Sequence, residues 1–266
     1  MSRGGLSFRL SCRSHLCYAR RMRQRVIGAA FFLLAASLWE STAHAYILPT
    51  DFLMRMVADR RRRMGLRDLT IQLQTEINNG ESEVEERIYF KQSERMRIVR
   101  EASPSSIYVD KEGVRAEGTP KLSRLSGATS NLLPLLFVPR GDDLEQAATH
   151  MVAGLRAVGI DVATVSLARN GEDIAYVIGA QPWETDKPQL WIDKERFLPV
   201  RCILQVPAGA KASKLETRML EYGSSVAGDW FPRVLETYRD GALLARAEVV
   251  SVQTNESLPE SLFDVP

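Results

Sequence analysis

The sequence predicts a mainly β, α+β domain built on one strongly curved antiparallel sheet of about eleven strands, half-open or closed into a barrel. Short stretches in which apolar and polar residues alternate fill much of residues 69–253, as expected of strands with one buried and one wet face. Asn-Gly and Asp-Gly pairs between them indicate hairpin turns. Strands and helices do not alternate as they would around a parallel sheet, and no linker divides the chain, so a single sheet is the simplest arrangement.

Residues 1–45 have the layout of a cleavable signal peptide. Four arginines in residues 20–25 precede residues 26–38, which carry no charge, and Ala43-His44-Ala45 offers small residues for cleavage before Tyr46. The uncharged run is shorter than the roughly 20 residues that span a bilayer. No cysteine follows it, so we expect a soluble periplasmic protein without a lipid anchor. Met22 is an alternative start that would give a more compact signal, leaving residues 1–21 outside the protein.

Composition limits the partners of the remaining domain, residues 46–266. Its 28 basic and 32 acidic residues give a formal charge of −4, which argues against a nucleic-acid partner. The one dense basic run, residues 60–63, falls on an expected helix, as a solvated face or as a surface for an acidic partner. Cys202 is the only cysteine after residue 45, so we expect a buried free thiol.

The expected domain opens with a helix and continues with four strands. Thr50 or Asp51 would cap the helix and Gly65 would end it. The apolar residues near helical spacing are Phe52, Leu53, Met56, Val57 and Met64. Strands are expected around residues 69–77, 84–91, 96–98 and 107–109, with a turn at Asn78-Asn79-Gly80. This is a meander of short hairpins.

The middle of the chain has a different character. Residues 131–139 are nearly all apolar, and Pro134 excludes a regular long helix there. Residues 142–158 predict a second helix with Asp142 and Asp143 at its positive end. Its apolar side comprises Leu144, Ala147, Ala148, Met151 and Leu155. Seven further strands are expected at residues 162–168, 174–180, 189–193, 200–206, 215–222, 231–238 and 243–253.

The sequence offers little for catalysis, so we expect no enzymatic activity, no catalytic residues, no metal and no cofactor. His150 is the only histidine after residue 45, and no nucleophile elbow or phosphate-binding loop is present. One histidine and one cysteine are too few for a usual zinc site. The acidic residues alternate with apolar residues along the strands, as expected of the wet face of a sheet. An acidic pair for glycoside hydrolysis stays open as an alternative.

The distinctive feature is a surplus of apolar residues. Leu132, Leu133, Leu135, Leu136 and Phe137 crowd one short segment, and Trp183, Trp191 and Phe197 follow later. Such residues either plug a curved sheet as core or line a cavity for an apolar ligand. These alternatives overlap, because a barrel plugged by movable segments can open, and each buried acyl methylene contributes about 0.8 kcal/mol.

The C-terminal third contains three segments with a recognisable pattern. The first is Leu190-Trp191-Ile192-Asp193 followed by Leu198-Pro199-Val200-Arg201, and the second is residues 230–235 (WFPRVL). They resemble the paired strands and the proline-headed strand of LolA-like outer-membrane lipoprotein-sorting proteins. Residues 249–266 resemble the closing strand and tail, in which Asn255, Leu258, Phe263 and Pro266 match the pattern. The resemblance is specific over residues 190–266 and architectural before them.

The resemblance implies an unclosed half-barrel over residues 46–266, with helices in its mouth. It implies a periplasmic carrier, chaperone or sensor that binds acylated lipoproteins or other lipid-like ligands and works with membrane-associated donor or acceptor proteins. We expect the protein to be a monomer. An arginine on an inner strand latches the lid in such carriers, and Arg95, Arg97 and Arg100 are candidates by region. The alternative is an envelope protein-interaction module, as in stress regulators, although those carry a second C-terminal domain.

On this interpretation the apolar face of the early strands lines the cavity and the middle segment plugs it. The expected ligand-binding residues are Ile71, Leu73, Ile88, Phe90, Met96, Ile98, Leu135, Leu136, Phe137 and Trp191.

Overall fold

Twelve antiparallel strands form one sheet in the computed structural model, which describes residues 47–77, 80, 82–91, 95–100, 106–110, 113–117, 136–137, 143–208 and 211–264. The expected signal peptide and most of the 131–139 segment lie outside these residues. The strands are β1 (Asp68–Ile77), β2 (Ser82–Lys91), β3 (Arg95–Arg100), β4 (Ser106–Asp110), β5 (Gly113–Glu117), β6 (Val165–Asn170), β7 (Asp173–Ile178), β8 (Gln189–Asp193), β9 (Pro199–Ala208), β10 (Lys211–Leu220), β11 (Val234–Arg239) and β12 (Ala242–Thr254). The helices are α2 (Thr50–Arg63), α4 (Leu144–Ala157) and the short 3-10 helix η1 (Glu260–Phe263).

Two meanders meet at the first and last strands. The order across the sheet is β5-β4-β3-β2-β1-β12-β11-β10-β9-β8-β7-β6, so the pairing of β1 with β12 joins an N-terminal meander to a C-terminal one. β5 and β6 are the two ends of this order, and the described strands do not close on themselves. The unclosed antiparallel half-barrel implied by the resemblance is confirmed, with β5 as a strand that the alternation of residues 113–117 was too short to predict.

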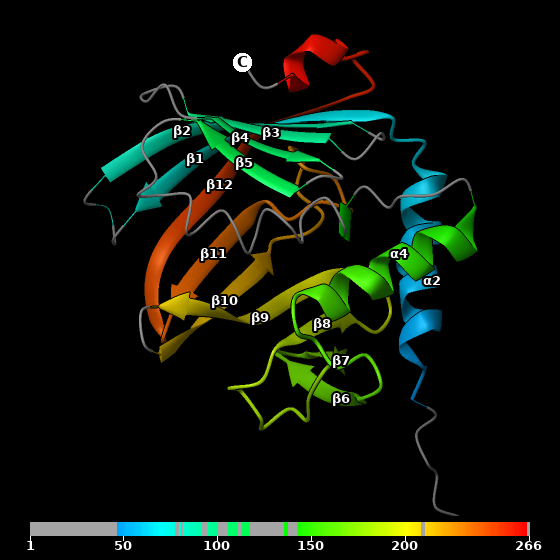
Figure 1. Ribbon diagram of the computed structural model, residues 1–266. Coiled ribbons are helices and arrows are strands. Elements are labelled where there is room, and N and C mark those ends of the chain that lie inside the picture. Colours follow the sequence, from blue (N-terminus) through cyan, green and yellow to red (C-terminus); the bar gives the residue numbers. More distant parts are fainter. Residues whose placement is uncertain are drawn as a thin grey trace, which may run out of the picture. The chain divides into compact units, whose positions relative to one another are not determined.

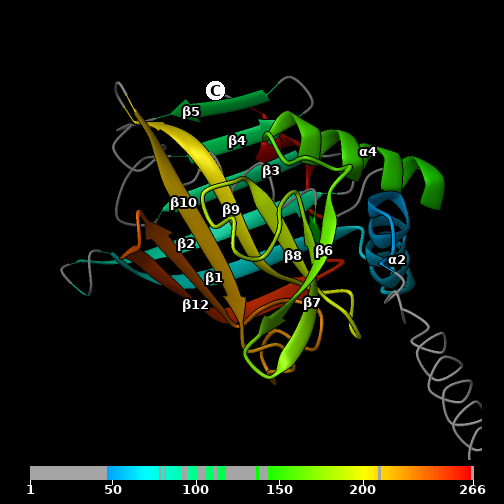
Figure 2. The same ribbon diagram turned by 90° about the horizontal axis from the view of Figure 1, so that it is seen from below.

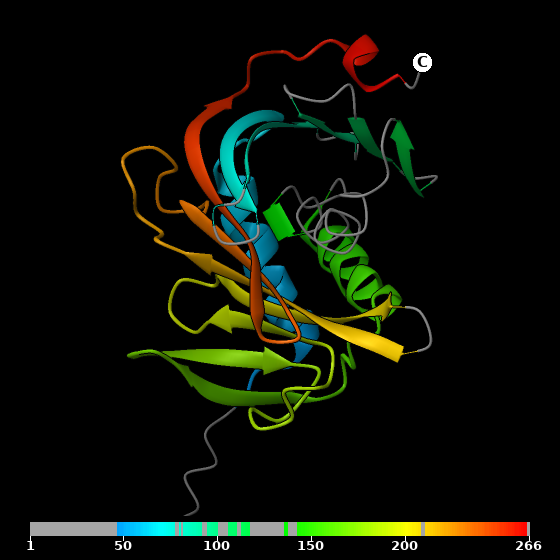
Figure 3. The same cartoon turned by 90° about the vertical axis from the view of Figure 1, so that its left-hand side faces the viewer.

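The sheet bends around α2 and α4 (Figures 1 and 3). Seen from below, both helices lie beside the strands of the two meanders (Figure 2). Register shifts occur between Gln72 and Leu73 on β1, Trp191 and Ile192 on β8, and Thr237 and Tyr238 on β11. Such bulges increase local twist and bend a strand, which helps one sheet to curve without breaking into two.

Strand boundaries differ from the expected ones where side chains form turns. β6 begins at Val165 and not at residue 162, because the carboxylate of Asp161 accepts hydrogen bonds from the Ala163 amide and the Thr164 hydroxyl. β11 begins at Val234 and not at the expected residue 231, and Phe231 is buried before the strand begins. The turn between β11 and β12 is confirmed: Asp240 and Gly241 both have positive φ, as a two-residue hairpin turn requires.

Helix α2 begins one residue earlier than expected. Its N-cap is Pro49, which makes no side-chain cap hydrogen bond, so the expected caps Thr50 and Asp51 are wrong. The Thr50 hydroxyl instead donates to the Val162 carbonyl at 2.7 Å and ties the helix to the start of the C-terminal meander. Gly65 follows the helix with φ of +61°, a conformation that glycine adopts without strain.

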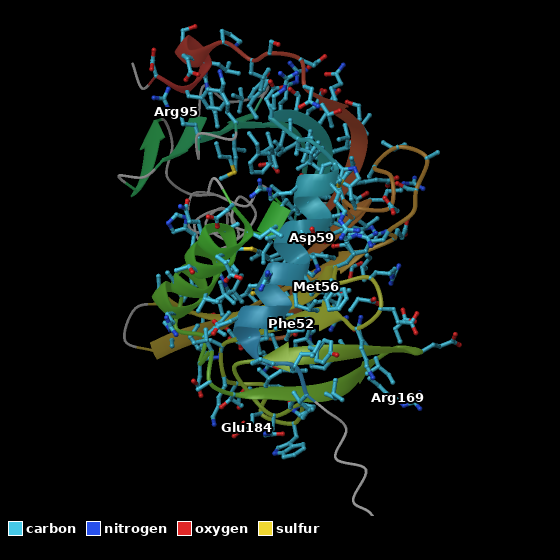
Figure 4. The ribbon with its side chains drawn as sticks, turned by 90° about the vertical axis from the view of Figure 1, so that its right-hand side faces the viewer. Phe52, Met56, Asp59, Arg95, Arg169 and Glu184 are labelled. Atoms are coloured by element: carbon cyan, nitrogen blue, oxygen red, sulfur yellow. The ribbon has the colours of Figure 1, made fainter. Side chains whose placement is uncertain are left out.

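The buried side of α2 also differs from the expected one. Its buried residues are Thr50, Leu53, Met54, Val57, Ala58 and Arg61. They recur at intervals of three and four and form one stripe along the helix. Phe52 is exposed and Met56 is half-buried, and both lie with Asp59 along the other side of α2 (Figure 4).

Helix α4 follows the sequence prediction closely. Asp143 is its N-cap and accepts a hydrogen bond from the Gln146 amide at 2.8 Å. Such a cap satisfies one of the free amides of the first turn. Its buried residues are Ala147, Ala148, Met151, Val152 and Leu155. All five are members of the large apolar core cluster, which also takes in α2 and one face of the sheet.

Candidate ligand-binding site

Six of the expected site residues form one apolar surface, here called the inner wall: Ile71, Leu73, Ile88, Phe90, Met96 and Ile98. Strand register aligns them, because Ile71 pairs with Ile88 on β2 and Ile88 pairs with Ile98 on β3. Leu69, Phe90 and Met96 form the parallel row one step along these strands. All six inner-wall residues are buried in the main cluster. The alternation seen in the sequence therefore does place them on one face.

Both helices pack on the same cluster as the inner wall. The stripe of α2 contributes Leu53, Met54, Val57 and Ala58, and the buried side of α4 contributes its five apolar residues. Among the residues that the structure describes, few polar contacts hold these helices in place. Arg55 of α2 forms an ion pair with Glu145 of α4 at 2.7 Å, on the surface, where such pairs contribute little. The cover over the inner wall is thus held chiefly by apolar contacts.

The middle segment joins this cluster at two described residues. Leu136 and Phe137 have helical backbone, are fully buried and belong to the same cluster as the inner wall. Phe137 packs against Phe231, with ring centroids 4.8 Å apart, and Phe231 packs edge-on against Trp230 at 5.5 Å. We call Phe137, Trp230 and Phe231 the aromatic corner. The expected site residue Leu135 lies outside the described residues.

Trp191 is not brought together with the other expected site residues. On β8, Leu190 and Ile192 enter the main cluster, and Trp191 points to the opposite, convex face of the sheet. It packs there with Ala175, Val177 and Val200. The correction follows from the period of two in a strand, since neighbours of an inward residue must point outward.

Paired polar groups surround Trp191 on the convex face. The indole nitrogen donates to the Gln189 side-chain oxygen at 2.7 Å, and the Arg201 guanidinium lies 4.9 Å from the ring centroid. Arg201 and Arg218 both donate to the Glu216 carboxylate, at 3.0 and 2.7 Å. Burial alone would raise the pKa of Glu216, but these hydrogen bonds and charges outweigh it and hold the pKa below its usual value.

Arg61 is buried, so neither a solvated basic face nor a surface for an acidic partner describes it. Its exposed fraction is 2%, and it lies in the aromatic corner. Its Nη1 donates to the Trp230 carbonyl at 2.7 Å, and its guanidinium lies 4.9 Å from the Phe137 ring and 5.7 Å from the Trp230 ring. Burial lowers its pKa to about 10, so it remains charged at neutral pH.

The helical spacing of the buried residues of α2 indicates that Arg61 is buried. Arg61 follows Val57 by four residues and Leu53 by eight, so it continues the buried stripe of α2 by one turn. Arg60, Arg62 and Arg63 do not share this position: Arg60 forms an ion pair with Asp229 at 3.0 Å, and the other two are exposed. Because the four arginines are consecutive, the sequence pattern did not distinguish the buried Arg61 from its three neighbours.

Two of the proposed latch arginines hold the C-terminal tail instead. Arg95 donates to Glu260 at 2.9 Å, and Arg97 donates to the Leu262 carbonyl at 3.1 Å. Both alternate with the inward residues Met96 and Ile98, so they belong to the convex face; Figure 4 shows Arg95 near the C-terminal segment. The side chain of Arg100 lies outside what the structure describes.

The remaining reactive groups are dispersed. His150 is exposed on α4, and Cys202 is a buried free thiol in the main cluster, as expected. Burial raises the pKa of Cys202 to about 12. Within the described ranges, acidic, histidine and cysteine side chains form no group of three able to hold a metal ion. None of the helices described here is long and apolar enough to cross a membrane.

Comparison with solved structures finds distant similarities of fold. A LolA superfamily protein from Nitrosomonas europaea is 13% identical, aligned over 82% of this chain and 98% of that chain with a TM-score of 0.47. A putative outer-membrane lipoprotein-sorting protein domain from Vibrio parahaemolyticus is 9% identical over 80% of this chain and 97% of that chain, with a TM-score of 0.45. MucB of Pseudomonas aeruginosa, in complex with MucA, is 13% identical over 82% of this chain and 61% of that chain, with a TM-score of 0.31.

Sequence comparison adds nothing to these similarities. No protein-family model matches the chain, and no curated protein matches it. The first two structures belong to the group that residues 190–266 resemble. The chain is similar in fold to LolA superfamily proteins, and a function for it has to be argued from its own geometry.

Proposed function

We propose that this chain is a periplasmic carrier or sensor that binds lipid-like apolar ligands, such as the acyl chains of lipoproteins destined for the outer membrane. The observation that carries the proposal is the inner wall itself: an apolar face on β1, β2 and β3 that ends at Glu86, opposite Leu73, and that packs in one cluster with two amphipathic helices. An acyl chain offers the same apolar contact as these helices, so it can replace part of their cover without specific chemistry.

The attachment of the cover supports movement. The described polar contacts between α2 and the rest of the domain include the Thr50 hydrogen bond, the surface pairs of Arg55 and Arg60, and the buried contact of Arg61. Surface pairs contribute little, and apolar contacts are non-directional. When a ligand replaces helix contacts, the free energy lost with the helix contacts and the free energy gained from the ligand contacts are both large. The net change in free energy is therefore small. The proposal involves binding without catalysis.

The direct test is ligand binding by the domain. Protein purified from the periplasm should carry a lipid mass in native mass spectrometry, and the delipidated protein should bind an apolar fluorescent dye and fatty acids. Failure to bind dyes, fatty acids and acylated peptides alike would contradict the proposal.

Neighbouring residues on β12 provide a matched pair for the inner wall. Val249 pairs with Leu73 and is buried in the main cluster, whereas Val250 is 49% exposed. A hydroxyl placed in an apolar site without a partner costs about 1–3 kcal/mol. We expect Val249→Thr to weaken dye binding about tenfold, and Val250→Thr to leave it unchanged, with circular dichroism confirming that both variants fold.

A protein-interaction role is the second candidate, and exposed apolar residues favour it. Trp183, in the loop between β7 and β8, is 76% exposed, and Ile174 on β7 is 44% exposed. Exposed tryptophans are enriched at protein interfaces. Under this alternative, a pull-down from envelope extract should recover a stable partner without bound lipid, and Trp183→Ala should release it.

A further inference from the structure

The guanidinium of Arg61 is almost fully enclosed, yet only part of its hydrogen-bonding capacity is used. Nη1 donates to the Trp230 carbonyl, and the rings of Phe137 and Trp230 lie within 6 Å of the guanidinium carbon. Nε and Nη2 are buried and have no hydrogen-bond acceptor among the residues that the structure describes. A buried donor without a partner costs free energy, and more so when it is charged.

The two unpaired donors form a recognition edge. In a guanidinium, the N–H groups of Nε and Nη2 point in parallel from the same edge, and this fork matches two oxygens of a carboxylate or phosphate. The opposite side carries Nη1, which the Trp230 carbonyl already occupies. The free edge of Arg61 therefore has the geometry of a bidentate site for an oxyanion.

No described carboxylate hydrogen-bonds to Arg61. Asp229 favours the charged form of Arg61 from a distance, but its ion pair is with Arg60 at the surface, where its side chain is 78% exposed. The Tyr222 hydroxyl donates to the Pro199 carbonyl, and neither Nε nor Nη2 of Arg61 donates to it. The pKa lowered to about 10 by burial still leaves a positive charge beside the apolar cluster at neutral pH. An uncompensated buried charge is strongly unfavourable, and an anion of matching shape would offset that cost.

We propose that Arg61 binds the anionic head group of an amphipathic ligand whose acyl chain lies along the inner wall. The inference rests on the proposed function and narrows its ligand class to acidic lipids with a carboxylate or phosphate head. The aromatic corner joins head and chain, because Phe137 and Trp230 contact Arg61 and belong to the same apolar cluster as the inner wall.

The test compares ligands that share one chain and differ in their head group. Hexadecanoate, hexadecyl phosphate and hexadecanol are titrated against the whole domain by isothermal calorimetry below their critical micelle concentrations, with inorganic phosphate as the head without a chain. We expect either anion to bind at least about tenfold more tightly than hexadecanol, because charge-assisted bidentate hydrogen bonds are among the strong ones. Tighter binding of one anion than the other identifies the head group.

Variants assign the preference to Arg61. Arg61→Met should bind hexadecanol as the wild type does and lose the preference for anions, whereas Arg61→Lys should retain part of it, since it keeps the charge and loses the fork. Arg62→Met, one residue away and exposed, is the matched control and should keep the full preference. Thermal unfolding verifies that each variant folds. If Arg61→Met does not fold, the ratio of the Kd for hexadecanol to the Kd for each anion in the wild type decides whether the site prefers anions.

The outcomes separate this inference from the proposed function. If neither hexadecanoate nor hexadecyl phosphate binds the wild type more tightly than hexadecanol does, the role of Arg61 is overturned and the apolar carrier is left intact. A preference that persists in Arg61→Met, or binding of inorganic phosphate as tight as that of hexadecyl phosphate, would also overturn it. Failure of all three chain-bearing ligands to bind would count against the carrier itself.

Discussion

The two faces of the curved sheet are stabilised by different interactions. On the concave face, a large apolar cluster includes α2 and α4, and the buried charge of Arg61 has no carboxylate partner among the described residues. On the convex face, charges come in pairs: Glu216 with Arg201 and Arg218, and Glu260 with Lys91 and Arg95. Directional pairs fix one geometry, whereas apolar contacts tolerate exchange. The difference teaches that the proposed exchange of helix contacts for ligand contacts breaks fewer directional contacts on the concave face than it would on the convex face.

Chemical labelling of Cys202 tests the difference between the two faces of the sheet, and its expected effect is the largest. The thiol is in the concave cluster, and burial raises its pKa to about 12. Because the thiolate is the reacting form, we expect iodoacetamide to modify it about a thousandfold more slowly than an ordinary thiol of pKa about 8.5. Val250→Cys in a Cys202→Ala background is the exposed control, followed by intact mass. Equal rates at the two positions would show that the concave cluster is open to solvent.

Truncation in the aromatic corner should produce the largest loss of stability. Phe231 is fully buried and contacts both Phe137 and Trp230. We expect Phe231→Ala to lower the free energy of unfolding by about 3–5 kcal/mol, because it leaves a cavity, as measured by urea denaturation. Val226→Ala, at a position 38% exposed, should change it by less than about 0.5 kcal/mol. A small effect of Phe231→Ala would contradict a close-packed corner.

The convex face should respond to the loss of a charge pair with a smaller, pH-dependent effect. Glu216→Gln is expected to lower the free energy of unfolding by about 1 kcal/mol at neutral pH, because Arg201 and Arg218 lose a charged acceptor. The loss is no larger because both arginines are partly solvated. The folded-state pKa of Glu216 is lowered, so its contribution is complete above the ordinary carboxyl range and is lost as the pH falls through the lowered pKa. Unfolding curves of the two proteins should therefore converge in acid. A difference that is constant with pH would contradict this assignment.

The C-terminal tail should show the smallest and most local effect. Glu260 is held by Lys91 and Arg95, whose hydrogen bonds and charges lower its pKa. We expect Glu260→Gln to speed amide hydrogen exchange in residues 255–264 without changing exchange in the sheet. The exposed Glu256, which offers only its backbone amide to Asp68, provides the control Glu256→Gln. As pH falls through the lowered pKa of Glu260, wild-type exchange in the tail should approach that of the variant.

Much of the fold follows from local patterns. The alternation on β1 and β2 predicted which residues point inward, and Asp143 and Gly65 marked helix boundaries that the structure contains. The side of α2 was harder to predict, because Phe52 and Met56 are as apolar as the residues that α2 buries, and only the neighbours of the helix decide between the two sides. The facing of Trp191 was likewise undecided, since β8 is apolar on both faces and all five of its residues are buried.

The sequence by itself determined the strands, turns and helices, because hydrophobic period, glycine and capping residues act within a few positions of the chain. The tertiary structure alone decided that β1 pairs with β12, that the tail docks on the convex face, and that Arg61 is buried. Arg61 donates to the carbonyl of a residue 169 positions away. Contacts at that separation depend on how the sheet curves and which helix covers it, and no local pattern encodes either.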